Sequence, residues 1–117
     1  KKNIVSEKSL AFALKALTFY KLHHSTSPLF LTKQFIRSAT SIGANIREAS
    51  AAESSKDFIH KMSIASKEAR ETLYWLDLYI QSGYFNAGSS NAPELYADCE
   101  ELCKILTAIV KTSKQRL

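Results

Sequence analysis

Residues that interrupt helices are scarce in this chain. Its 117 residues include only three glycines and two prolines, which argues against an all-β or a disordered chain. No apolar run approaches the roughly 20 residues that span a bilayer, so we expect no membrane helix. Neither an uninterrupted apolar segment nor a small-residue cleavage site follows the two N-terminal lysines, so we expect no export signal and a cytoplasmic location.

Cysteine is equally scarce. Cys99 and Cys103 lie four positions apart, where they could form half of a metal site or pack side by side in a core. We favour the core, because buried free cysteine behaves as a small hydrophobe and no nearby histidine or second cysteine pair completes a zinc set. We therefore expect no metal, no cofactor and no disulfide framework.

Turn-forming residues divide the chain into four long stretches. They cluster around Ser27-Pro28, around Ser54-Ser55 and from Gly83 to Pro93. Between these clusters the apolar residues recur every three or four positions, which is typical of amphipathic helices. The predicted helices cover residues 4–23, 28–52, 55–82 and 92–115.

Several residues suit the ends of these helices. We expect Ser27 and Ser54 to act as N-caps, Asn91 to form a capping box with Glu94, and Gly83 to follow the end of the third helix. Short connections between helices of similar length predict antiparallel neighbours. The sequence therefore predicts one domain over residues 1–117, an all-α, up-down-up-down four-helix bundle.

Three of the helices carry one clear apolar row each, which we expect to form the core. The rows are Leu31, Phe35, Ala39, Ile42, Ile46 and Ala49 in the second helix, Phe58, Met62, Ala65, Ala69, Leu73, Leu76 and Ile80 in the third, and Leu95, Cys99, Leu102, Leu106, Ile109 and Val110 in the fourth.

The first helix carries two apolar rows instead of one. We expect the row Leu10, Ala13, Leu14 and Leu17 to face the core, and the row with Phe12, Ala16 and Phe19 to face another subunit. Three further residues beside the core face of the third helix extend this expected interface, namely Ile64, Trp75 and Tyr79. The alternative is a broad core with some exposed aromatic side chains.

The net charge of +5 is unevenly distributed. Residues 1–47 hold eight bases and one acid, residues 77–103 hold five acids and no base, and residues 104–117 hold four bases and no acid. Helical periodicity places several bases opposite the predicted core, where they could contact phosphates. These candidate nucleic-acid-binding residues are Lys33, Arg37, Arg47, Lys56, Lys67 and Arg70. Lys1, Lys8 and Lys15 also recur every seven positions. The alternative is an ordinary solvated helix face.

Catalytic constellations are not evident. Glu68 and Glu71 could serve acid–base chemistry or a metal pair, but a di-iron bundle needs Glu-x-x-His pairs, and the chain has none. No histidine is placed beside a nucleophile. We expect these carboxylates to form salt bridges and the protein not to be an enzyme.

One segment of the second predicted helix resembles a known family signature. Residues 37–49 read Arg-Ser-Ala-Thr-Ser-Ile-Gly-Ala-Asn-Ile-Arg-Glu-Ala, and a second segment from Lys56 to Leu76 also fits. Both are similar to the four-helix-bundle proteins encoded in intervening sequences of bacterial large-subunit ribosomal RNA genes, also called the S23 ribosomal protein family. The similarity extends over about residues 10–85.

This resemblance implies an antiparallel bundle assembled as a homopentamer, with no established enzymatic activity. The chain also resembles the accessory protein of diversity-generating retroelements, which implies binding to nucleic acid and to a reverse transcriptase. The acidic stretch from Asp77 to Glu101 departs from a uniformly basic surface.

Two functions are compatible with these patterns. The first is a homo-oligomeric scaffold that binds nucleic acid with low sequence specificity. The second is an adaptor that binds a protein partner through the acidic stretch and the second apolar row of the first helix. A metal-dependent enzyme is a third, weaker hypothesis.

Overall fold

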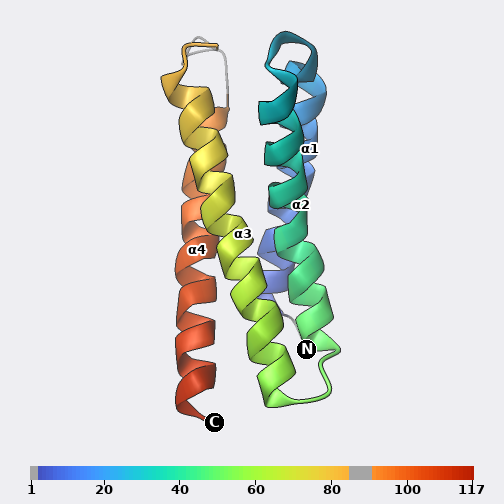
Figure 1. The fold of residues 1–117 in the computed structure, drawn as a ribbon, viewed down its shortest axis with the longest axis vertical. Coiled ribbons are helices and arrows are strands. Elements are labelled where there is room, and N and C mark those ends of the chain that lie inside the picture. The colour runs from blue at the N-terminus through green and yellow to red at the C-terminus, as the bar shows by residue number, and fades with distance from the viewer. Residues whose placement is uncertain (1–2, 85–90) are drawn as a thin grey trace.

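Four long helices make up the computed structural model, which describes residues 3–84 and 91–117 (Figure 1). They are α1 (Ile4–His23), α2 (Leu29–Ser50), α3 (Ser55–Gln81) and α4 (Ala92–Gln115), with a short 3₁₀ turn, η1 (His24–Thr26), before α2. No strand occurs in this part of the chain. The predicted all-α, antiparallel four-helix bundle is confirmed.

Each helix packs against two neighbours. α3 contacts α2 and α4, while α1 contacts α2 and α4, so α1 lies diagonally opposite α3. The chain runs alternately up and down, and both termini lie at the same end of the bundle (Figure 1). Part of the predicted gap from Gly83 to Pro93, residues 85–90, lies outside the described residues, as does Lys1.

The residues that we predicted to cap the helices are partly correct. Ser54 caps α3 by accepting a hydrogen bond from Asp57 N at 3.0 Å, and Gly83 follows α3 with φ of 75°. Asn91 precedes α4 as predicted, but its side chain makes no capping bond. Ser27 is not a cap, because its hydroxyl donates to the His23 carbonyl oxygen at 2.7 Å and Pro28 takes the N-cap position.

The predicted core rows of α2 and α4 are largely correct. The six predicted residues of α2 are all buried, and in α4 only the last two, Ile109 and Val110, are half-buried. The row of α3 is partly wrong: Ile80 is 39% exposed, and Phe58 and Leu73 are half-buried. Because α3 packs against both α2 and α4, its buried arc instead takes in Ile59, Ser66, Thr72 and Tyr79.

The two apolar rows of α1 are the reverse of the prediction. Phe12, Ala16 and Phe19 are buried in the bundle core, whereas the row with Leu10, Leu14 and Leu17 is about half exposed. Phe19 packs edge-on against Phe35 and Tyr79, which explains why the aromatic row points inward.

Three of the five residues that we expected at a subunit interface lie in the core of the bundle instead. Phe12, Phe19 and Tyr79 have at most 2% of their surface exposed within one chain, so they are not available to a second subunit. Burial raises the pKa of the Tyr79 hydroxyl to about 12, despite its hydrogen bond with Ser27. Ile64 and Trp75 are half-buried on α3, and Trp75 Nε1 donates to Glu71 at 3.0 Å.

Gly43 lies in the middle of α2, where glycine costs helix stability relative to alanine. The position faces α1 closely: a Cβ at Gly43 would lie 3.2 Å from the Oγ of Ser9. Ser9 is itself buried and donates to the Ser6 carbonyl oxygen at 2.9 Å. The glycine therefore permits the close approach of α1 and α2.

We expect Gly43→Ala to stabilise the protein more when Ser9 is also changed to alanine. Alanine gains up to about 1 kcal/mol of helix propensity, and the tight contact with the Ser9 hydroxyl offsets this gain in the wild-type background. Denaturant unfolding of the two single variants and the double variant measures the coupling. Equal effects of Gly43→Ala in both backgrounds would contradict the close-contact explanation.

Candidate functional site

A basic concave surface lies between α3 and α4. Lys67 and Arg70 of α3 face Lys111 and Lys114 of α4 across a groove of about 530 Å³. Residues three or four positions apart on a helix share one face, so each helix supplies two cations about one turn apart. The floor is uncharged and consists of Ser63, Ser66, Thr107 and Val110.

The four cations of this groove are available to a ligand. None of them belongs to an ion pair with any carboxylate that the structure describes. Lys114 lies in the last turn of α4, where the negative end of the helix dipole favours a cation. Four neighbouring cations without an ion-pair partner among the described residues create a positive potential that attracts polyanions.

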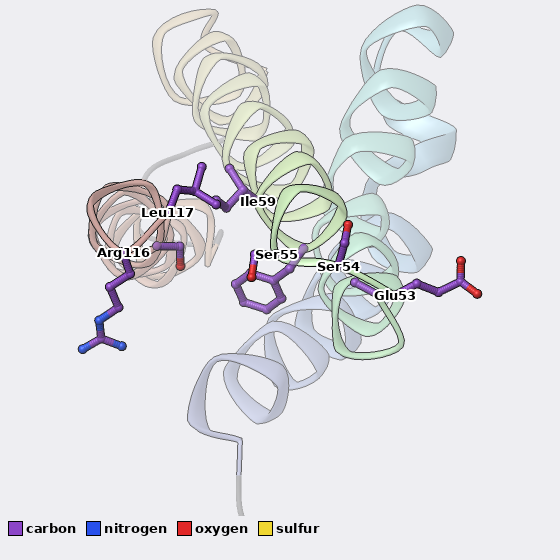
Figure 2. A pocket seen from close by; sticks show the side chains of 9 residues that line it. Glu53, Ser54, Ser55, Ile59, Arg116 and Leu117 are labelled. Atoms are coloured by element: carbon purple, nitrogen blue, oxygen red, sulfur yellow. The ribbon is translucent and has the colours of Figure 1, made fainter.

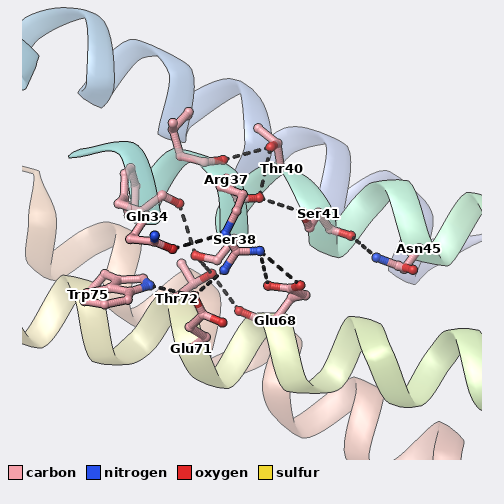
Figure 3. A network of polar contacts seen from close by, with 12 residues as sticks. Gln34, Arg37, Ser38, Thr40, Ser41, Asn45, Glu68, Glu71, Thr72 and Trp75 are labelled. Atoms are coloured by element: carbon pink, nitrogen blue, oxygen red, sulfur yellow. Dashed lines mark hydrogen bonds and ion pairs between the residues drawn. The ribbon is translucent and has the colours of Figure 1, made fainter. Parts of the chain in front are cut away.

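Arg37, which the sequence placed among the phosphate contacts, has partners within the bundle. Its guanidinium bridges to Glu68 at 3.1 Å and hydrogen-bonds Glu71, and both glutamates lie on α3 (Figure 3). Trp75 and Gln34 complete the network, as Gln34 Oε1 accepts from Arg37 Nε at 3.2 Å. The expectation that Glu68 and Glu71 form salt bridges is confirmed, and Arg37 is better assigned to the α2–α3 contact.

A buried pair of hydroxyls lies beside this network. Thr72 of α3 donates to Ser38 Oγ of α2 at 2.8 Å, and Ser38 donates to the Phe35 carbonyl oxygen at 3.1 Å (Figure 3). Both hydroxyls are fully buried, so leaving either without a partner would carry a desolvation cost. The polar contacts thus fix the position of α3 against α2.

The Arg37 network makes stability depend on pH. Burial by itself would raise the pKa of the Glu71 carboxyl, but the hydrogen bonds from Trp75 and Arg37, with the charge of Arg37, lower that pKa below its ordinary value. A carboxyl with a lowered folded pKa stabilises the fold above its unfolded pKa. That contribution is lost as the pH falls through the folded value.

We therefore expect the wild-type protein to lose more stability than Glu71→Gln between about pH 5 and pH 3. Denaturant unfolding at several pH values measures this difference. Glu53→Gln, which removes an exposed carboxyl from the α2–α3 connection, is the control and should follow the wild type. Parallel curves for wild type and Glu71→Gln would show that the carboxyl of Glu71 does not contribute.

The other predicted phosphate contacts lie outside the groove. Lys56 is in the first turns of α3, and helical periodicity places it on the same face as Lys67 and Arg70. Lys33 is exposed near the start of α2, while Arg47 lines a smaller hollow between α1 and α2. The structure therefore brings together two of the six predicted residues and adds Lys111 and Lys114.

Two of the three lysines of α1 are paired with the acidic segment. Lys15 contacts Glu94 and Asp98 at 3.1 and 2.9 Å, and Lys8 contacts Glu101 at 3.0 Å. These exposed pairs contribute little stability, but they neutralise the acidic face of α4 beside α1. The basic residues of the N-terminal half and the acidic residues of segment 77–103 are far apart in the sequence but lie side by side in the fold.

A second concavity lies at the end of the bundle near Leu117 (Figure 2). It measures about 490 Å³, and its lining combines serine hydroxyls with apolar groups such as Phe58 and Ile59. Its two charged residues, Glu53 and Arg116, extend away from each other, so no pair of charges converges on the hollow (Figure 2).

The cysteines occupy the expected core position. Cys99 is buried and its thiol donates to the Ala69 carbonyl oxygen at 3.3 Å, while Cys103 is half-buried against the core. Across residues 3–84 and 91–117, no three histidine, cysteine or acidic side chains converge in a way that could hold a metal ion. In the same part of the chain, every helix is too short or too polar to cross a membrane.

Comparisons with known proteins agree on the family. The family model of the 23S rRNA-intervening sequence protein matches residues 1–108. A similar solved structure is that of a protein with unknown function from the S23 ribosomal protein family of Bacteroides thetaiotaomicron VPI-5482. It is 43% identical with a TM-score of 0.83, and the match covers 92% of this chain and 98% of that chain. No curated protein matches.

Proposed function

The chain belongs to the 23S rRNA-intervening sequence protein family, and from this premise we propose that it is a non-catalytic, homo-oligomeric scaffold that binds RNA or an RNA–DNA intermediate. The groove between α3 and α4 carries the proposal. Its four cations have no ion-pair partner among the described residues, and lysine and arginine neutralise phosphates.

The lining of the groove favours the nucleic-acid backbone over the bases. Its floor consists of hydroxyls and one valine, and no aromatic side chain lines it to stack on a base. Hydroxyl, lysine and arginine groups are common phosphate and sugar contacts, which position a nucleic acid without reading its sequence. Binding should therefore have low sequence specificity and a strong dependence on salt.

Oligomerisation would strengthen such binding. One groove with four cations offers only a few phosphate contacts, whereas several linked grooves on one polyanion gain from a high effective concentration. The family resemblance implies five copies, and each copy would contribute the same α3–α4 surface.

The alternative function, an adaptor that binds a protein partner through the acidic stretch from Asp77 to Glu101, has less support. Three of the acids of α4, Glu94, Asp98 and Glu101, are paired with Lys8 and Lys15 of the same chain. A basic partner would have to displace these pairs, whereas a phosphate at the α3–α4 groove displaces none that the structure describes. The resemblance to the accessory protein of diversity-generating retroelements also implies a reverse transcriptase as a protein partner.

We expect Lys67→Glu and Lys111→Glu each to weaken binding to a labelled RNA, and the double variant to weaken it further. Each lost phosphate contact should reduce the slope of log K against log salt by roughly 0.7–0.9. Fluorescence anisotropy across a salt series measures both quantities, with labelled DNA of the same sequence in parallel.

Lys33→Glu is the matched control, because it makes the same charge change on the exposed surface of α2, away from the groove. An equal loss of affinity in Lys33→Glu and Lys111→Glu would show that binding is not confined to the groove, because Lys33 is itself among the phosphate contacts that the sequence predicts. No binding by the wild type at low salt would refute the proposed function.

A further inference from the structure

The outer face of α1 is unusually apolar for a solvated surface. Leu10, Leu14 and Leu17 are 48%, 57% and 47% exposed, although the opposite face of α1 already fills the bundle core. A helix of a four-helix bundle needs only one apolar row. The second row on α1 therefore stays largely exposed in the part of the chain that the structure describes.

The spacing of this outer row is that of a helix–helix seam. Glu7, Leu10, Leu14, Leu17 and Lys21 follow one another at intervals of three, four, three and four residues, as the a and d positions of a heptad do. The flanking positions are Ala11, Ala13 and Thr18, which are small enough for another helix to approach closely. Charge appears only at the two ends of the row.

A hollow lies beside the leucine row, between α1 and α2. It measures about 220 Å³, and its lining combines small residues, including Ser9, Gly43 and Ala44, with Leu10 of the leucine row itself. Arg47 lies at its rim, next to Ser6 of α1, so the hollow has a positive charge at the end of α1 where Glu7 lies on the leucine row. Neither Glu7 nor Arg47 is in an ion pair with a residue that the structure describes.

We propose that the outer face of α1 is the surface through which copies of this chain associate, with the leucine row of one copy packed into the α1–α2 hollow of the next. One molecule carries both complementary parts: apolar knobs with an acid beside them, and a small-residue hollow with a base beside it. That pairing identifies a second copy as the occupant. This inference deepens the oligomer of the proposed function.

The leucine row and the hollow adjoin on one side of the molecule and share Leu10, whereas Leu14 and Leu17 belong only to the row and Ala44 only to the hollow. The proposed contact is head-to-tail: leucines of one copy enter the hollow of the next, without the reverse contact between the same two copies. Such contacts close into rings when the rotation between copies permits it, whereas a contact between identical patches stops at a dimer. The knob and the hollow can therefore be disabled separately, and this separates the proposed contact from a two-fold one.

The test measures mass in solution by light scattering on a size-exclusion column. The wild type should elute as a multiple of the 13.1 kDa chain, and Leu14→Glu and Leu17→Glu should each elute as a monomer. Ala44→Trp, which fills the hollow, should do the same. Leu22→Glu is the control, because Leu22 is an exposed leucine of α1 outside the row and its variant should keep the wild-type mass.

Mixing the disabled variants gives the decisive result. Leu14→Glu keeps an intact hollow and Ala44→Trp keeps an intact leucine row, so an equimolar mixture should form a one-to-one dimer. Circular dichroism checks that each variant is folded, and Leu17→Glu replaces Leu14→Glu if the latter is not. A monomeric wild type, an unchanged mass in both leucine variants, or a mixture that stays monomeric would overturn the proposal.

The same samples separate this inference from the proposed function. If α1 joins the copies but the groove does not bind nucleic acid, the masses change as described while the wild type shows no RNA binding at low salt. If the groove binds but α1 does not join the copies, Leu14→Glu retains both the wild-type mass and the wild-type affinity.

Discussion

The rotation of α3 about its own axis decides what this protein presents to its surroundings, and the contact of Arg37 with Glu68 and Glu71 fixes that rotation. The two glutamates face α2, and the neighbouring positions Lys67 and Arg70 face α4 as a result. The buried hydroxyl pair of Ser38 and Thr72 reinforces the same contact, because the hydrogen bond from Thr72 to Ser38 is lost if α3 turns. The basic groove therefore depends on a polar contact made on another side of the helix.

Local signals in the sequence were sufficient to predict the four helices, but not the orientation of α1. The bounds of the helices are predictable to within about two residues, because turn residues and apolar periodicity act over short ranges. On α1, two apolar rows have the same spacing, so periodicity could not say which faces inward. The packing of Phe19 on Phe35 and Tyr79 decides it, and both partners lie on other helices.

The candidate site was predictable only where it lies on one helix. Lys67 and Arg70 share a face of α3, so periodicity found them. Lys111 and Lys114 are also one turn apart, within the acid-free segment 104–117, but only the packing of α4 against α3 places them opposite the first pair. The ion pairs of Arg37 could not be predicted from local patterns, because its partners are 31 and 34 positions away in the sequence.

An even number of alternating helices returns the chain to the end at which it started, so the first and last helices lie side by side (Figure 1). Joining the two ends by a linker and opening the chain between α2 and α3 would keep every helix contact described above. The order of the helices along the chain is then separable from their arrangement in space. Fluorophores or fused domains at either terminus would also project from one end of each copy, away from η1.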